Sequence, residues 1–388
     1  MPLVDALRRE ARSVPASGII AVADHARGRP GLIPLWVGEG DSPTPDFIRS
    51  AASGSLAEGH TFYTWQGGIP PLLEALSRYH LRTFGRSCAP DEFIVTGGGM
   101  QAIQLAMQAV GGAGDEIIYF SPAWPNFPAA FGITGGTPVP VSLTFTDNGW
   151  SLDLDQVESA ITGKTKAIFV NTPANPTGWT ADEETLRALL ALARRHGLWI
   201  IADEIYTRFH YDEGRAPSFF DIAEDEDRII FVNSFSKNWA MTGWRVGWIR
   251  AHRSLKPIFD HLVQYSTSGV AEFMQRGAVA ALDEGDTFIG QQVERARKAR
   301  DLLCSTLLET GRVRLAPPPG AFYLFFAVDG VSNAHAGAID LVDSTGIGLA
   351  PGTAFGAEGE GYFRLCFNRR LDQIEVAAEK IAEWIRAR

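Results

Sequence analysis

The chain has 388 residues, of which 45% are hydrophobic and 21% charged, a length that favours two hydrophobic cores and therefore two domains. Its net charge of −10 argues against a nucleic-acid or anionic-membrane partner. The first residues show no apolar core of signal-peptide length, no apolar run reaches membrane-spanning length, and the three cysteines are scattered. We therefore expect a cytoplasmic protein without a disulfide framework or a bound metal.

The order of the predicted elements favours an α/β fold. Residues 1–40 are too few for a core of their own and are expected to form an arm on a smaller domain. In residues 41–283, strand-like runs alternate with helical patterns, which is typical of a mostly parallel sheet sandwiched by helices. Residues 284–388 begin with a long charged helix and continue with alternating strands and an amphipathic helix, so we expect a smaller α+β domain formed by both chain ends.

The first predicted strand, residues 93–96, ends at Gly97, Gly98 and Gly99, and a helix is expected from Met100. Free backbone N–H groups and the helix dipole at such a junction favour a phosphate. A tight turn explains three glycines equally well. Neither a P-loop nor a dinucleotide fingerprint completes the pattern, so the phosphate is not expected to belong to a nucleotide.

Two further strand ends carry side chains that suit an aromatic ring. Trp124 follows the strand predicted at residues 116–120, and its indole could lie on a ring, although tryptophans usually pack in cores. Asn175 lies in a turn-rich loop after the strand at residues 167–170, where an Asn-Pro turn alone would be structural.

An acidic residue ends the next predicted strand, residues 198–202. A carboxylate such as Asp203 is unfavourable at a buried strand end unless it meets a cation or a donor, and a protonated pyridine nitrogen would supply one. Tyr206 could then bind a phenolic oxygen of the same ring. The alternative is that Asp203 and Glu204 are an ordinary acidic pair at the start of a helix.

A lysine and an arginine among small hydroxyls follow the strand at residues 228–232. Lysines are usually exposed, but ligands of open α/β sheets bind just past such strand ends. The Lys237 amine can form a Schiff base with an aldehyde, and Ser234, Ser236 and Arg245 can donate to phosphate oxygens. Pyridoxal phosphate carries both an aldehyde and a phosphate.

Arg364 lies in a strand predicted at residues 363–367 of the smaller domain. A strand arginine usually faces solvent. If it faces the cleft instead, its guanidinium would bind a carboxylate in a bidentate manner.

Together these residues resemble the class I/II pyridoxal-phosphate aminotransferases of fold type I, the aspartate aminotransferase superfamily. The similarity spans nearly the whole chain, and the order and spacing of its motifs make it specific. The matching segments are residues 38–41, Tyr63, Gly98 and Gly99, Trp124, and residues 175–178, 203–206, 234–237 and 351–356, followed by Arg364.

The resemblance implies a role for each residue. Lys237 would hold the cofactor and carry the proton, Asp203 would partner its pyridine nitrogen, and Tyr206 would bind its phenolic oxygen. The substrate α-carboxylate would be bound by Arg364, Asn175 and the backbone of Gly38. The groups implied in binding the cofactor are Tyr63 of a neighbouring subunit, Gly98, Gly99, Met100, Trp124, Asn175, Asp203, Tyr206, Ser234, Ser236, Lys237 and Arg245.

The implied activity is ping-pong transfer of an amino group from an α-amino acid to a 2-oxo acid by a homodimer with shared active sites. Aspartate-preferring relatives often have a lysine where this chain has Met100, so we expect an apolar or aromatic donor. A cis peptide bond between Asn175 and Pro176 is also implied.

Other functions fit the same residues less well. A carbon–sulfur β-lyase uses the same cofactor and lysine, and the sequence leaves this alternative open. A transcription regulator on this fold would need a DNA-binding domain before Gly38, where we expect too few residues for one. A binding module without activity does not explain the combination of Lys237, Asp203 and Arg364.

Overall fold

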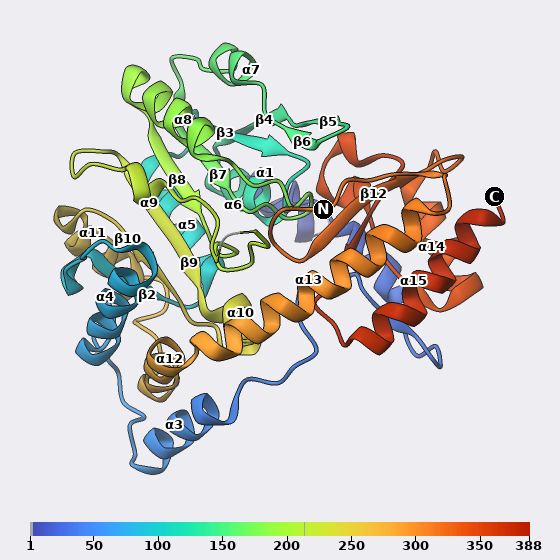
Figure 1. Ribbon diagram of the computed structural model, residues 1–388. Coiled ribbons are helices and arrows are strands. Elements are labelled where there is room, and N and C mark those ends of the chain that lie inside the picture. The colour runs from blue at the N-terminus through green and yellow to red at the C-terminus, as the bar shows by residue number, and fades with distance from the viewer. Residues whose placement is uncertain (1–2, 213) are drawn as a thin grey trace.

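The computed structural model describes residues 3–212 and 214–388, and two larger sheets organise it, one of seven strands and one of four (Figure 1). In the seven-stranded sheet, β10 is antiparallel to both of its neighbours and every other neighbouring pair is parallel. This confirms the predicted α/β fold with a mostly parallel sheet. The strands, in their spatial order, are β2 (Phe93–Thr96), β10 (Gly247–Arg250), β9 (Ile229–Ser234), β8 (Trp199–Asp203), β7 (Thr165–Asn171), β3 (Glu116–Ser121) and β4 (Thr137–Ser142).

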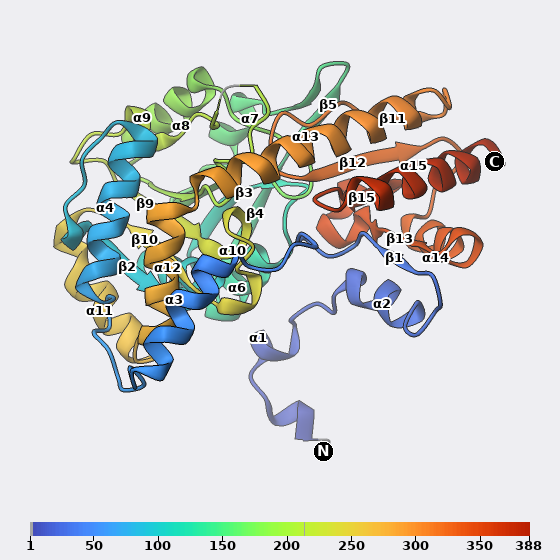
Figure 2. The ribbon, with the colours of Figure 1, turned by 60° about the horizontal axis from the view of Figure 1, so that its bottom comes forward.

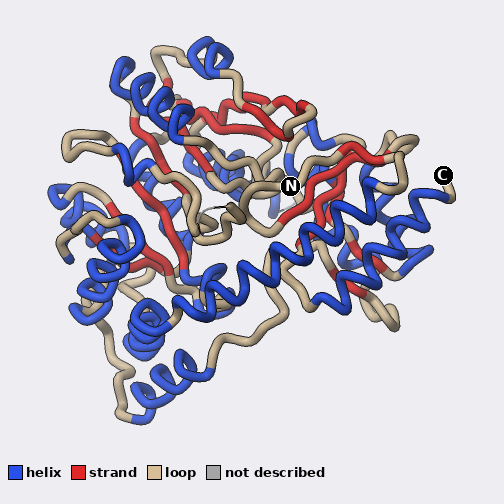
Figure 3. The backbone as a smooth tube through the Cα atoms, viewed as in Figure 1, coloured by secondary structure: helices blue, strands red, loops and turns tan. Residues whose placement is uncertain are grey.

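Helices lie on both faces of this sheet (Figure 3). Its central strands β8 and β9 are accordingly buried, largely apolar runs. Successive side chains of a strand point to opposite faces, and in β8 Ile200 and Ile201 accordingly belong to different cores. Helices that share the core of Ile200 include α4 (Pro70–Phe84), α8 (Glu183–His196), α9 (Phe219–Ile222) and α12 (Glu272–Glu284). Those that share the core of Ile201 are α5 (Gly99–Val110), α6 (Asn126–Thr134) and α11 (Lys256–Gln264).

The smaller sheet is antiparallel, with the order β11-β12-β15-β14. Its strands are β11 (Val313–Arg314), β12 (Tyr323–Val328), β15 (Tyr362–Cys366) and β14 (Ala350–Pro351). The helices α14 (Ala334–Thr345) and α15 (Leu371–Arg386) pack against it, and the amphipathic α15 buries Ile374, Ile381 and Ile385 in the shared core.

The N-terminal segment reaches both parts of the molecule. Its strand β1 (Ile33–Pro34) pairs in parallel with β13 (Ile347–Gly348), and Val22 of α2 (Gly18–His25) is buried in the core of the smaller sheet. The residues before α2 lie elsewhere: next to the short helix α1 (Arg9–Arg12), the Arg8 guanidinium donates to the Ile133 carbonyl of α6.

The long helix α13 (Asp286–Leu308) runs from the larger sheet to the smaller one (Figure 2). We retain residues 1–40, 41–283 and 284–388 as proposed divisions of the chain.

In the described residues, no helix combines the length and the apolar character that crossing a membrane requires. The remaining elements are α3 (Asp46–Ala57), α7 (Leu154–Ser159), α10 (Phe235–Asn238), the hairpin β5 (Thr144–Thr146) and β6 (Gly149–Ser151), and the 3-10 turns η1 (Leu3–Ala6), η2 (Pro90–Glu92), η3 (Thr242–Trp244), η4 (Arg253–Leu255), η5 (Gly352–Phe355) and η6 (Ala357–Gly359).

Candidate active site

A cavity of about 410 Å³ lies where the carboxyl ends of β7, β8 and β9 meet the smaller sheet. Most of the site residues predicted from the sequence line this cavity, although they come from distant parts of the chain. They are Gly38, Gly99, Met100, Trp124, Asn175, Asp203, Tyr206, Ser234, Ser236, Lys237, Arg245 and Arg364.

Two predicted residues are not on the cavity wall. Gly98 lies just behind it, against Arg245. Tyr63 does not line the cavity, and 93% of its surface is exposed. A role for Tyr63 at a phosphate therefore requires a second copy of the chain.

Lys237 lines the cavity from the short helix α10, which begins directly after β9. The helix starts because the Ser234 hydroxyl accepts a hydrogen bond from the Ser236 N–H at 3.2 Å. The Lys237 amine donates to the Gly38 carbonyl at 2.6 Å. Burial lowers the pKa of this amine to about 8, and the cations Arg364 and Arg245 act in the same direction. A substantial neutral fraction is thus present near pH 8, and the neutral amine is the nucleophilic form.

Asp203 ends β8 and is only 1% exposed. Its carboxylate accepts a long hydrogen bond, 3.4 Å, from the Ile205 N–H. Burial raises the pKa of Asp203 to about 7, against the lowering effects of the Ile205 N–H and the nearby Lys237. A buried carboxylate with so few donors fits a cationic heterocycle as its partner.

The junction between β2 and α5 forms a cradle suited to a phosphate. Gly98, the N-cap of α5, has a φ of 88°, and a Cβ placed on it would lie 2.5 Å from the Arg245 Nη2. A Cβ on Gly99 would lie 3.4 Å from that of Ser234. Glycine is therefore required at Gly98, where a side chain would clash with the guanidinium, whereas a Cβ on Gly99 would only make ordinary contact with Ser234. Free N–H groups, a guanidinium and hydroxyls are the donors that a phosphate needs.

Arg364 enters the cavity from β15 and is 2% exposed. Its Nη1 donates to the Asn175 Oδ1 at 3.2 Å, and its Nη2 donates to the Trp36 carbonyl. Its Nε has no hydrogen-bond partner within the part of the chain that the structure describes. A buried cation with an unused donor fits a carboxylate ligand.

Asn175 is followed by a cis peptide bond, and Tyr206 is hydrogen-bonded to a second tyrosine. The Asn175–Pro176 peptide bond is cis, which confirms the prediction. The Tyr206 hydroxyl is hydrogen-bonded at 2.6 Å to the hydroxyl of Tyr323, a residue that the sequence analysis did not select.

The sequence analysis missed about half of the cavity wall. The arm contributes Ile19 and Ile20 from α2, whose spacing in the sequence indicates ordinary helix packing. Tyr323 lies in an apolar strand and gives no signal of a functional role. The other missed lining residues are Ser17, Val37, Glu39, Ile103, Asn126, Asn171, Ile205 and Thr242.

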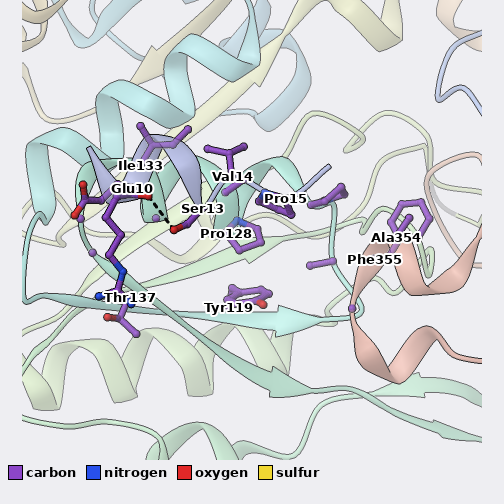
Figure 4. Close-up of a pocket in the computed structure, with 18 residues that line it drawn as sticks. Glu10, Ser13, Val14, Pro15, Tyr119, Pro128, Ile133, Thr137, Ala354 and Phe355 are labelled. Atoms are coloured by element: carbon purple, nitrogen blue, oxygen red, sulfur yellow. Dashed lines mark hydrogen bonds between the residues drawn. The ribbon is translucent and has the colours of Figure 1, made fainter. Parts of the chain in front are cut away.

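A second cavity, of about 550 Å³, lies between the N-terminal segment and α6 (Figure 4). Val14 and Pro15 of the segment face Pro128 of α6 and Tyr119 of β3 across it. Although it is larger, it contains none of the predicted site residues. The candidate active site is therefore the smaller cavity, around Lys237.

Comparison with known proteins identifies the family. The profile of the family "Aminotransferase class I and II" matches residues 31–381. Among curated relatives, the aspartate aminotransferase of Thermotoga maritima is 32% identical over 92% of each chain, and the aspartate/prephenate aminotransferase of Thermus thermophilus is 33% identical over 97% of this chain and 98% of the relative.

Solved structures give the same result at the level of the fold. The crystal structure of the Thermotoga maritima aspartate aminotransferase superposes with a TM-score of 0.91 at 31% identity, covering 97% of this chain and 99% of the other. An alanine aminotransferase from Pyrococcus furiosus gives a TM-score of 0.92 at 28% identity, covering 98% of this chain and 100% of the other. The chain therefore belongs to the class I and II aminotransferases, a family of pyridoxal-phosphate-dependent enzymes of fold type I, and is an aminotransferase.

Proposed function

We propose that this aminotransferase binds pyridoxal phosphate in the cavity around Lys237 and moves the amino group of an apolar or aromatic α-amino acid to a 2-oxo acid. The observation that carries the proposal is the position of Lys237, Asp203 and Arg364 in one cavity, where Asp203 and Arg364 are fully buried and Lys237 is half-buried. When bound, pyridoxal phosphate supplies an aldehyde that condenses with amines and a ring that accepts the electron pair released at the substrate Cα.

The residues fit that cofactor group by group. The Asp203 carboxylate would keep the pyridine nitrogen protonated, because a buried anion favours a cation beside it. Asn175 and Tyr206 would donate to the phenolic oxygen, and the indole of Trp124 would cover the ring. The phosphate would be held by Ser234, Ser236, Arg245 and the backbone of Gly98, Gly99 and Met100, with Tyr63 of a second subunit.

The Lys237 amine would also serve as the proton carrier. Its lowered pKa, about 8, places it near the range in which a general base is effective. Its hydrogen bond to the Gly38 carbonyl keeps it beside the backbone that, with Arg364 and Asn175, would hold the substrate carboxylate. Lys237 would therefore lie beside the residues that hold the substrate and could carry its proton.

The donor class follows from the remaining wall of the cavity. The cations that line it in the described part of the chain are Lys237, Arg245 and Arg364, and each has another role above. No described lining cation remains for a second carboxylate. The remaining wall is instead mainly apolar, with Ile19, Ile20, Trp36, Val37, Met100, Ile103 and Trp124 beside a few polar side chains.

A donor panel tests this function. With pyruvate or 2-oxoglutarate as acceptor, leucine, phenylalanine and methionine are expected to give a higher kcat/KM than aspartate, by roughly tenfold or more for a carboxylate without a partner. Aspartate as the best donor would contradict the proposed class. Pyruvate release from cystathionine without any 2-oxo acid would instead identify a β-lyase on the same site.

We also propose a homodimer. Four aromatic side chains are exposed in the single chain to an extent unusual for their size: Phe62 84%, Tyr63 93%, Trp65 70% and Tyr265 86%. Covering them with a second copy would remove this apolar surface from water and would bring Tyr63 to a neighbouring phosphate cradle.

A further inference from the structure

One tyrosine of the smaller sheet lies between the two halves of the proposed site. Tyr323 begins β12, pairs with Cys366 of β15, is fully buried and lines the cavity. Its hydroxyl and its ring contact different residues.

The hydroxyl of Tyr323 meets the cofactor side of the site. It is 2.6 Å from the Tyr206 hydroxyl, and either oxygen can be the donor. The same hydroxyl packs against Gly38, where an added Cβ would overlap it. Because Gly38 has no side chain, Tyr323 can lie against the backbone that accepts from Lys237.

The ring of Tyr323 meets the substrate side. The Arg364 Cζ lies 4.8 Å from the centre of this ring and 4.9 Å from that of Phe355, so both rings contact the guanidinium. Such contacts are strongest where water is excluded, as it is around these buried residues. The rings restrict the direction in which the guanidinium presents its donors.

We propose that Tyr323 is a positioning residue with two separable roles: its hydroxyl donates to Tyr206 and strengthens Tyr206 as a donor to the cofactor, and its ring orients Arg364 for the substrate carboxylate. This inference rests on the proposed function of the site. A hydroxyl that accepts a hydrogen bond becomes a better donor, so the chain from Tyr323 through Tyr206 stabilises a negatively charged phenolic oxygen more than Tyr206 alone.

Two substitutions separate the roles in the holoenzyme. Tyr323→Phe removes the hydroxyl and retains the ring, whereas Tyr323→Leu removes both. The first readout needs no substrate: it is the pH midpoint of the visible absorbance of the bound cofactor. The second is the KM, set against kcat, of the best amino donor of the wild-type enzyme. The charged and titratable groups around the two hydroxyls, namely Arg364, Asp203, Glu39 and Cys366, are the same in every variant.

For Tyr323→Phe, we expect the absorbance midpoint to rise by on the order of half a pH unit, because the phenolic oxygen keeps its proton to higher pH when its donor is weakened. The donor KM should stay within about twofold, since the ring contact is retained. For Tyr323→Leu, the midpoint should rise similarly, and the donor KM should rise roughly 3- to 30-fold as the ring contact is lost.

Two further variants serve as controls. Tyr211→Phe removes a hydroxyl that donates to the Ala321 carbonyl in the same core, away from the cavity, and should change neither readout. Phe355→Leu removes the other ring beside Arg364 and should raise the KM without moving the midpoint.

The inference is overturned if the absorbance midpoint of Tyr323→Phe equals that of the wild type, or if this variant raises the donor KM as much as Tyr323→Leu does. A wild-type protein that shows no visible cofactor absorbance after incubation with pyridoxal phosphate would overturn the proposed function, and this inference with it. The wild-type spectrum therefore distinguishes the two failures.

Discussion

At the scale of single residues, the site depends on ionisable groups that burial has moved away from their ordinary pKa values. Burial raises the pKa of Asp203 to about 7 from 3.8, and lowers that of Lys237 to about 8 from 10.5. Without a bound partner, burial therefore disfavours the charged form of each side chain. A cofactor with a cationic ring and an aldehyde gives each group a partner, so the groups that are unfavourable without it are those that bind it.

The raised pKa of Asp203 makes the stability of the cofactor-free protein depend on pH. The folded state holds a proton on Asp203 up to about pH 7, whereas the unfolded state releases it near pH 4, so this carboxyl lowers stability as the pH rises between those values. We expect the thermal midpoint of the cofactor-free wild type to fall relative to that of Asp203→Asn across this range. Glu204, whose pKa burial also raises to about 7, contributes equally to both proteins. Parallel curves for the two proteins from pH 4.5 to 7.5 would refute the assignment.

At the scale of elements, the phosphate cradle depends on how α5 begins. In Gly98→Ala, the new Cβ would collide with the Arg245 guanidinium, and the alanine would have to adopt the φ of 88° found at this position. We expect the dissociation constant for pyridoxal phosphate to rise roughly 10- to 100-fold, because charged hydrogen bonds to the phosphate are lost. Equilibrium dialysis against the cofactor measures this change.

Gly59→Ala is the matched control for that variant. Gly59 also has a positive φ, 83°, but a Cβ there meets nothing within 4 Å. Both variants therefore place a Cβ on a positive-φ backbone at a cost of about 1–3 kcal/mol, with the larger strain at Gly98, whose ψ of 171° lies in a region that is essentially restricted to glycine. If Gly59→Ala weakens cofactor binding as much as Gly98→Ala does, general destabilisation explains the result and the cradle does not.

The sequence predicts the elements that build this cradle better than it predicts how they meet. Buried β-branched runs mark β7, β8 and β9, and the polar residues just after them mark the edge of the sheet. The four-residue strand β10 carries no such mark, yet it lies between β2 and β9. A Cβ on its Gly247 would lie 2.8 Å from the Gly98 carbonyl carbon, so this unselected glycine allows α5 to reach Ser234.

Residues on the smaller sheet are harder to assign for a similar reason. Tyr323 and the apolar side chains of α2 match the periodicity of ordinary core positions. Their contact with the site depends on how the smaller sheet and the arm pack against the larger sheet, and local sequence does not encode that arrangement. Arg364 could be selected because a charged side chain within an apolar strand is unusual.

At the scale of the whole molecule, the proposed dimer places parts of one active site on two chains. Tyr63→Ala and Lys237→Ala should each be nearly inactive, since one lacks the cross-subunit phosphate contact and the other lacks the amine. In a mixed dimer, one site combines the intact Lys237 of one chain with the intact Tyr63 of the other. After the two variants are mixed, dissociated and reassociated, about a quarter of the wild-type activity is expected to return. A mixture that stays as inactive as its components, while sedimentation shows that mixed dimers form, would exclude a shared site.

The central claim is that Lys237, among all lysines of the chain, holds the cofactor. Borohydride reduction of the protein after incubation with pyridoxal phosphate fixes the cofactor to the amine that bears it, and peptide mass mapping identifies that residue. We predict that the reduced cofactor is found on the peptide containing Lys237 and that Lys237→Ala takes up none. Stoichiometric label on another lysine, or none on the wild type, would contradict the account.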